Sequence, residues 1–189
     1  MPMSAVPESA KVVRQVATSG VLSALAVVLA LVIRFPLLPA APYLIYEPSD
    51  VPLLLAAFRL SPLWVTGISA AVAVVMGLTG SGGLIGMTSR FVGSAALGLT
   101  AAVVYQRVAA RGRGKVVSVV AGVVVYTLAE VALTLILGPL FFGDLQTALA
   151  MILPVVVPFN LIKGGLNGVA ALLVDTGVSV WTGRSSRAE

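Results

Sequence analysis

Four long stretches of this chain carry almost no charge, namely Val16 to Ile33, Leu60 to Ser89, Val116 to Ala129 and Leu145 to Lys163. A helix needs about 20 apolar residues to cross the hydrocarbon of a bilayer, so several crossings fit into 189 residues. Only 10% of the residues are charged, whereas a soluble domain carries roughly a quarter. The mean hydropathy is +1.07. We therefore expect an integral membrane protein, with the lipid bilayer as its surroundings.

Cysteine and histidine are absent from the sequence. Their absence removes disulfides, thiolate nucleophiles, imidazole bases and the commonest metal ligands. We therefore predict no catalytic residues, no metal site and no enzyme. The net charge of +5 could indicate nucleic acid, but the Lys and Arg residues lie in short groups between apolar stretches, so topology explains them better and no nucleic-acid partner is expected.

The apolar pattern predicts one domain, residues 1–189, of the all-α membrane class with six transmembrane helices. The expected helices are about 12–33, 49–60, 63–79, 84–108, 116–137 and 147–181. The second helix is too short to cross upright if Arg59 marks its end. Part of the loop before it is therefore expected to dip into the membrane beside it.

The distribution of basic residues predicts the orientation. With a cytoplasmic N-terminus, nine Lys and Arg residues lie inside and two lie outside, so the positive-inside rule places both termini in the cytoplasm. The inside set is Lys11, Arg14, Arg59, Arg107, Arg111, Arg113, Lys115, Arg184 and Arg187, and the outside pair is Arg34 and Arg90. The loop 34–49 then faces outward.

That outer loop is chemically richer than the inner links. Its segment PYLIYEPSDVP holds Tyr43, Tyr46, Glu47 and Asp50 among three prolines that restrict the backbone. These four side chains are candidate ligand contacts. Ser49 or Asp50 could also serve as the N-cap of the second helix, and the two roles are compatible.

Ionisable groups within the expected spans are functional candidates because they are expensive to place in a bilayer. Lys163 precedes Arg184 by 21 residues, about 30 Å along a continuous helix, which places it in the outer part of the last helix. Asn160, Lys163 and Asn167 follow i, i+3, i+7 spacing and share one face. They are expected to form one wall of a polar pocket, although snorkelling to the interface is an alternative for Lys163. Asp175 is interpreted as a solvated helix end.

Glu130 is expected near mid-depth in the fifth helix. It could pair with Lys163, remain protonated without a partner, or contact a ligand. A lone acid within the membrane would also suit a stand-alone proton-coupled carrier.

Small residues recur along the first helix, including Gly20-x3-Ala24 and Ala26-x3-Ala30. This spacing lets helix backbones approach closely in a membrane. Packing within the chain and contact with another subunit fit the pattern equally well.

Three segments together resemble a known family: YLIYEPSDVP after the first helix, SPLWVTG after a short second helix, and LPVVVPFNLIKGGLN in the last helix. They are similar to the substrate-binding S components of energy-coupling-factor (ECF) vitamin transporters, and most to the riboflavin-specific group. The likeness extends from Ala17 to about Trp181.

The resemblance implies a six-helix protein of a prokaryotic plasma membrane, with extracellular loop 1 capping a pocket on the outward side. It implies that Asn160 and Lys163 bind a vitamin, with riboflavin as transported ligand rather than cofactor. It also implies partners, a transmembrane scaffold subunit and two ATPase subunits, and places Gly20, Ala24, Ala26 and Ala30 at the scaffold interface.

One departure from the riboflavin group concerns the fifth helix, where Glu130 and Thr134 stand in place of an asparagine. The alternative ligands are therefore cobalamin or a pyrimidine or pyridine precursor. The alternative from another class is the proton-coupled carrier that would use Glu130.

Overall fold

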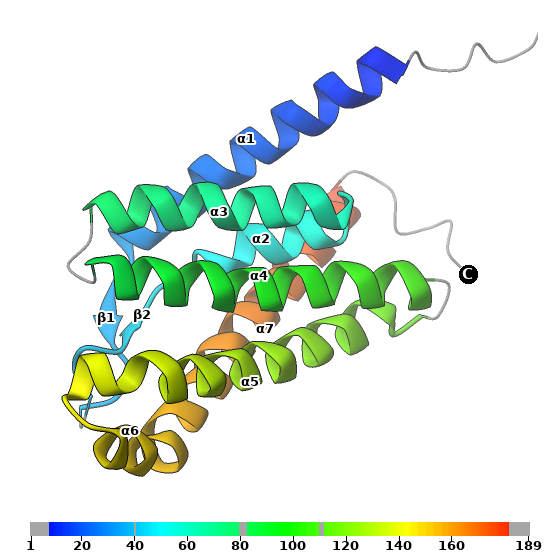
Figure 1. Ribbon diagram of the computed structural model, residues 1–189. Coiled ribbons are helices and arrows are strands. Elements are labelled where there is room, and N and C mark those ends of the chain that lie inside the picture. Colours follow the sequence, from blue (N-terminus) through cyan, green and yellow to red (C-terminus); the bar gives the residue numbers. More distant parts are fainter. Residues whose placement is uncertain (1–7, 40, 80–82, 110–111, 182–189) are drawn as a thin grey trace, which may run out of the picture.

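A computed structural model describes residues 8–39, 41–79, 83–109 and 112–181. These residues form a bundle of helices with one short pair of strands (Figure 1). The helices are α1 (Glu8–Val32), α2 (Asp50–Ala57), α3 (Pro62–Thr79), α4 (Gly83–Val108), α5 (Gly114–Phe142), α6 (Leu145–Met151) and α7 (Val157–Trp181), with a π-helical turn, η1 (Ile152–Val156), joining α6 to α7. The strands β1 (Phe35–Pro36) and β2 (Ile45–Tyr46) pair antiparallel.

Five helical segments of the described chain are long and apolar enough to cross a membrane: α1, α3, α4, α5 and the continuous run from α6 to α7. The remaining predicted helix, α2, has eight residues, and all of them are buried. The all-α prediction is therefore confirmed, whereas α2 is a helix inside the bundle rather than a crossing of its own.

The helix α5 extends five residues beyond its predicted end at residue 137. Gly138 and Pro139 suggested a loop, but Pro139 lies within the helix, which ends at Gly143 with φ of 91°. Only glycine adopts this left-handed conformation without strain. Asp144 then begins α6 by accepting hydrogen bonds from the backbone N–H and the hydroxyl of Thr147, at 2.7 and 2.6 Å.

The buried helix α2 organises the bundle. It packs against α1, α3, α4 and α7, and α3, α4 and α5 lie side by side while α1 crosses the α3 side of the molecule (Figure 1). Close approach requires glycine at Gly122 of α5, where an added Cβ would lie 2.8 Å from the carbonyl oxygen of Leu97. Many large apolar side chains on the spanning helices remain exposed, as lipid-facing residues do in a membrane protein.

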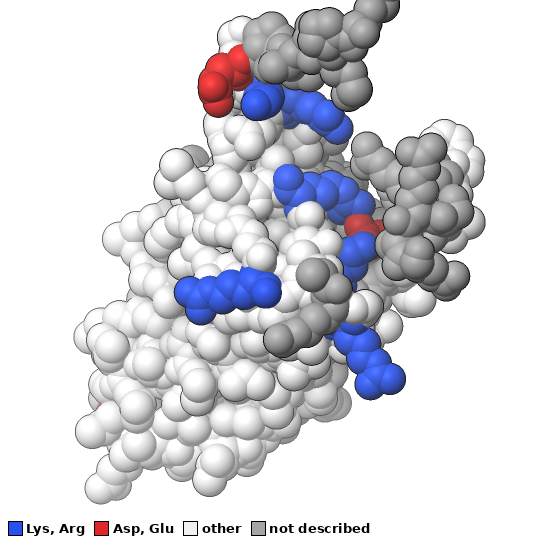
Figure 2. Space-filling view, turned by 90° about the vertical axis from the view of Figure 1, so that its right-hand side faces the viewer, with Lys and Arg blue, Asp and Glu red and all other residues white. Residues whose placement is uncertain are grey.

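The two ends of the bundle differ in charge. We call one the basic end: it comprises the start of α1, the α2–α3 link, the α4–α5 link and the end of α7 (Figure 1). The opposite one is the strand end, with β1, β2 and the α5–α6 turn. Figure 2 looks onto the basic end, where Lys and Arg gather. The described cations there are Lys11, Arg14, Arg59, Arg107, Arg113 and Lys115, whereas Arg111, Arg184 and Arg187 lie outside the described residues.

Asp175 is not the solvated helix end that the sequence suggested. Its side chain is 4% exposed and forms ion pairs with Arg59 and with Lys115. The pairing joins the α2–α3 link, the start of α5 and α7. Proximity to the basic end was predicted correctly, but the neighbouring helices cover the carboxylate and supply its partners.

Candidate functional site

A cavity of about 310 Å³ opens at the strand end, between α4, α5, α7 and the loop that carries β2. Its volume lies at the lower end of the range for small-molecule sites, about 300 to 1,000 Å³. Its lining combines apolar and aromatic side chains with hydroxyl, amide and charged groups. The polar and charged residues that line it are Arg34, Tyr43, Ser89, Arg90, Ser94, Tyr126, Glu130, Thr134, Asn160 and Lys163.

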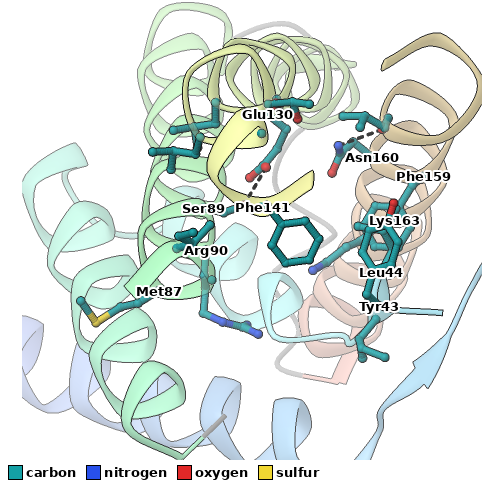
Figure 3. A pocket seen from close by; sticks show the side chains of 18 of the residues that line it. Tyr43, Leu44, Met87, Ser89, Arg90, Glu130, Phe141, Phe159, Asn160 and Lys163 are labelled. Atoms are coloured by element: carbon teal, nitrogen blue, oxygen red, sulfur yellow. Dashed lines mark hydrogen bonds between the residues drawn. The ribbon is translucent and has the colours of Figure 1, made fainter. Parts of the chain in front are cut away.

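The α7 wall of the cavity presents Phe159, Asn160 and Lys163, and Val156 at the end of η1 continues this face at helical spacing. The wide turn η1 precedes this face, and such π-helical turns are frequent at functional sites. Asn160 donates a hydrogen bond from Nδ2 to the carbonyl oxygen of Val156 at 2.9 Å, which fixes the amide and turns its oxygen toward the cavity (Figure 3). Asn160 and Lys163 therefore share the wall that their spacing predicted.

Glu130 reaches the cavity from α5. Its Oε2 accepts a hydrogen bond from the hydroxyl of Ser89 at 2.8 Å (Figure 3). Gly93 makes room for it, because a Cβ there would collide with Glu130 Oε1 and lie 2.7 Å from the Tyr126 ring. The sequence left open whether Glu130 pairs with Lys163. In the structure its hydrogen-bond donor is the hydroxyl of Ser89 on α4 instead.

Lys163 pairs instead with Glu47, with 3.7 Å between Nζ and Oε1. Glu47 is 1% exposed and also forms an ion pair with Arg90 of α4. Burial alone would raise the pKa of Glu47, but the charges of Lys163 and Arg90 hold this pKa below its usual value. Glu47 does not line the cavity, but it offsets the charge of two cations that do, Lys163 and Arg90.

Asn167 connects α7 to the loop rather than lining the cavity. It is fully buried; its Oδ1 accepts from the Tyr46 hydroxyl at 3.0 Å, and its Nδ2 lies 3.3 Å from the Glu47 carbonyl oxygen and from Asp50 Oδ2. Asp50 also accepts from the Ser94 hydroxyl at 2.6 Å. Four predicted site residues therefore form a buried clasp, defined as Tyr46, Glu47, Asp50 and Asn167, behind the cavity wall.

Tyr43 does line the cavity, and it lies in an aromatic cluster with the end of α5. Its ring centroid is 5.5 Å from that of Phe141 and 6.0 Å from that of Phe142. Such tilted and edge-on pairs favour packing between rings. The loop is thereby connected to both α5 and α7.

Sequence reasoning did not identify Arg90, Ser89, Tyr126 and the aromatic pair Phe141–Phe142 as site residues. Arg90 was counted as an outer-surface charge, because a sequence gives the depth of a residue but not its direction around the helix. A basic residue within an otherwise uncharged span was the available signal.

The four small residues predicted for a partner interface separate in the structure. Ala26 and Ala30 are fully buried in the core where α1 packs on α2 and α3. Gly20 and Ala24 are exposed. Packing within the chain therefore accounts for Ala26 and Ala30. For Gly20 and Ala24, a role in partner contact stays a prediction.

The described residues include no group of three or more His, Cys, Asp or Glu side chains that could hold a metal ion. The chemistry of the cavity is that of a binding site for an organic molecule. Cations, hydroxyls and an amide line it together with aromatic and aliphatic groups.

Comparisons with known proteins agree with this geometry. The family model for the substrate-specific component of ECF transporters matches residues 14–174. The chain is 30% identical over 174 residues to the riboflavin transporter RibU of Staphylococcus aureus (strain TCH60), covering 85% of this chain and 88% of that protein. A solved structure described as the S component of a bacterial ECF transporter superposes with a TM-score of 0.68 at 25% identity, covering 89% of this chain and 97% of the other.

The family match covers most of the chain, and five helical segments are suited to crossing a membrane. The family consists of transporter components rather than enzymes, and its members reside in the cell membrane as multi-pass proteins. This chain belongs to the family of substrate-specific (S) components of ECF transporters.

Proposed function

We propose that this chain binds riboflavin, or a close flavin, in the cavity at the strand end and delivers it to an ECF transporter. The observation that carries the proposal is a polar wall of Asn160 and Lys163 facing Glu130 across a cavity with aromatic sides. Carbonyls and hydroxyls of a flavin match these donors and acceptors, and its flat ring system matches the aromatic and aliphatic groups. The likeness to RibU supports the same ligand.

The proposed roles of the predicted site residues differ by position. Asn160, Lys163, Glu130 and Tyr43 contact the ligand, because they line the cavity. The buried clasp holds loop 1, residues 34–49, against α4 and α7, and acts on the ligand through the position of that loop. In this arrangement loop 1 caps the cavity.

The proposed orientation places both termini in the cytoplasm of a prokaryotic cell and the cavity at the outer surface. The gathering of Lys and Arg at the basic end supports it, because positive residues favour the cytoplasmic side. Transport then requires a transmembrane scaffold subunit and two ATPase subunits as partners.

The test is equilibrium binding to the purified full-length protein in detergent, with riboflavin, cobalamin, and pyrimidine and pyridine vitamin precursors as ligands. We expect tight riboflavin binding and a yellow preparation when ligand co-purifies. Tight binding of another vitamin together with no riboflavin binding at micromolar concentration would contradict the flavin assignment. The cavity volume favours a flavin over the much larger corrin of cobalamin.

The carrier alternative depends on Glu130 as a proton site. It is tested by riboflavin uptake in cells that produce this chain but lack the ATPase partners. We expect no uptake above background. Uptake that persists without ATPases and is abolished by Glu130→Gln would support the carrier instead.

A further inference from the structure

A second crevice lies at the basic end, at the opposite end of the bundle from the cavity. It is lined by Lys11, Arg14, Gln15 and Thr18 of α1 and by Arg59 and Leu60 of the α2–α3 link. The four α1 residues occupy positions i, i+3, i+4 and i+7, so they share one helix face. None of the lining residues is acidic.

The polar groups around this crevice are arranged as donors. Gln15 Oε1 accepts a hydrogen bond from the Trp64 indole at 3.2 Å, which leaves its amide N–H groups for another partner. Arg59 is held in place by the Leu55 carbonyl oxygen and by Asp175, and a guanidinium has five N–H donors, of which these bonds use only part. Lys11, Arg14 and the Thr18 hydroxyl complete a set that suits an anion.

The level of the crevice in the bundle indicates where that anion comes from. It lies beside the first turn of α3, a helix of 18 residues, which is about 27 Å and close to the thickness of the hydrocarbon. Trp64, which contacts Gln15, belongs to the residue type that concentrates at the membrane interface. The same two elements carry exposed apolar side chains at this level of the bundle: Val12 and Val16 on α1, and Leu63 on α3.

We propose that this crevice binds the phosphate of an acidic phospholipid headgroup, with the acyl chains lying against the exposed apolar side chains beside it. Lys11, Arg14 and Arg59, the last of which also pairs with Asp175, line one crevice at headgroup level, and cations gathered at that level attract anionic lipid. The site would fasten the start of α1 to the α2–α3 link. The inference requires only that the chain spans a bilayer, and it does not depend on which vitamin the cavity binds.

The test is native mass spectrometry of the full chain released from nanodiscs of phosphatidylcholine containing a quarter phosphatidylglycerol. We expect retained phosphatidylglycerol in excess of its share. Lys11→Gln with Arg14→Gln should lower retention roughly tenfold or more, since each cation near a membrane surface contributes several-fold to anionic-lipid affinity. The matched control is Arg107→Gln with Arg113→Gln, which removes two cations of the same end that do not line the crevice.

Phosphatidylglycerol retention that falls in the crevice variant and persists in the control variant supports the site. Folding of the crevice variant is checked by riboflavin binding equal to that of the wild type. If neither protein binds riboflavin, equal unfolding temperatures serve as the check. Equal retention of the two lipids by wild type, or equal losses in the two variants, overturns it. Addition of inorganic phosphate separates the two sources of the anion, lipid headgroup and free phosphate. Displacement of the lipid by phosphate alone would indicate a soluble-anion site and overturn the lipid assignment.

Discussion

Lys163 lines the cavity and also lies 3.7 Å from the buried carboxylate of Glu47. Removing its ammonium deletes a charged donor that faces the ligand, whereas Arg90 still pairs with Glu47. We expect Lys163→Ala to weaken riboflavin binding roughly tenfold or more, the effect of losing one hydrogen bond to a charged group. Titration calorimetry measures the affinity. Lys163→Arg is the control for charge, and unchanged affinity in a folded Lys163→Ala protein would remove Lys163 from the ligand contacts.

Gly93 lies directly behind Glu130 and Tyr126, which we call the cavity floor. A methyl group there would collide with Glu130 and approach the Tyr126 ring to 2.7 Å. We expect Gly93→Ala to displace both side chains and to lower riboflavin affinity more than it lowers stability. The matched control is Gly67→Ala on α3, where an added Cβ has nothing within 4 Å. Equal affinities of the two variants would show that the floor does not shape the ligand site.

At the scale of elements, charge-free length was sufficient to place the helices. Each of the four nearly uncharged stretches includes all or a large part of a spanning segment, because a membrane span depends on composition over about 20 residues. Predicted boundaries for α3 and α4 differ from the observed ones by one residue. The end of α5 was missed, because neighbouring helices support a helix through Pro139 that local propensity would break.

Partners across the bundle could not be predicted, because pairing depends on rotation about each helix and on contacts distant in sequence. Tyr46 and Asn167 are 121 residues apart and form one hydrogen bond. Glu130 and Lys163 were both placed in the membrane from sequence, yet each has a different partner, Ser89 and Glu47. Residue type and spacing therefore predicted the α7 wall, and the structure was needed to separate cavity residues from the clasp.

The ion pairs of Asp175 join three elements at the basic end. Breaking a fully buried ion pair costs about 3 to 5 kcal/mol, but the side chains of Arg59 and Lys115 are 37% and 41% exposed, so water offsets part of the loss. We expect Asp175→Asn to destabilise the protein by about 1 to 2 kcal/mol and to lower its unfolding temperature by several degrees. Thermal unfolding in detergent measures this, with exposed Glu8→Gln as control. A loss no larger than that of the control would show that the triad contributes little.

On the scale of the whole molecule, the charged groups divide between two ends with different roles. At the basic end they join the α2–α3 link, the start of α5 and α7, and at the strand end they surround the cavity and fasten loop 1 to α4 and α7. The buried carboxylate of Glu47 is central to the second set, since it pairs with one cation on each of these helices. Loop position and ligand binding are therefore expected to change together when this carboxylate changes charge.

Acid should release loop 1 only at low pH. The pKa of Glu47 is raised by burial but lowered further by Lys163 and Arg90, so that it lies below its usual value in the folded protein. Because this pKa is lower in the folded protein, ionised Glu47 stabilises the fold fully when the pH is above the pKa of a glutamate in the unfolded chain, about 4.3. This stabilisation is lost as the pH falls through the lower pKa of Glu47 in the folded protein. We expect riboflavin affinity and unfolding temperature to be insensitive to Glu47 between about pH 5 and pH 8 and to fall below about pH 4.

Two variants assign this acid loss to its group. Glu47→Gln should bind weakly at every pH and lose the acid-dependent step, because the neutral amide cannot pair with the two cations. Glu130→Gln keeps the ion pairs of Glu47 and should therefore keep that step. The measurement is riboflavin binding by fluorescence quenching across the pH series. Lys163 and Arg90 remain charged throughout the pH series, so they cannot cause a step in acid themselves. An acid-dependent step that survives in Glu47→Gln would therefore mean that a group other than Glu47 controls the closing of loop 1.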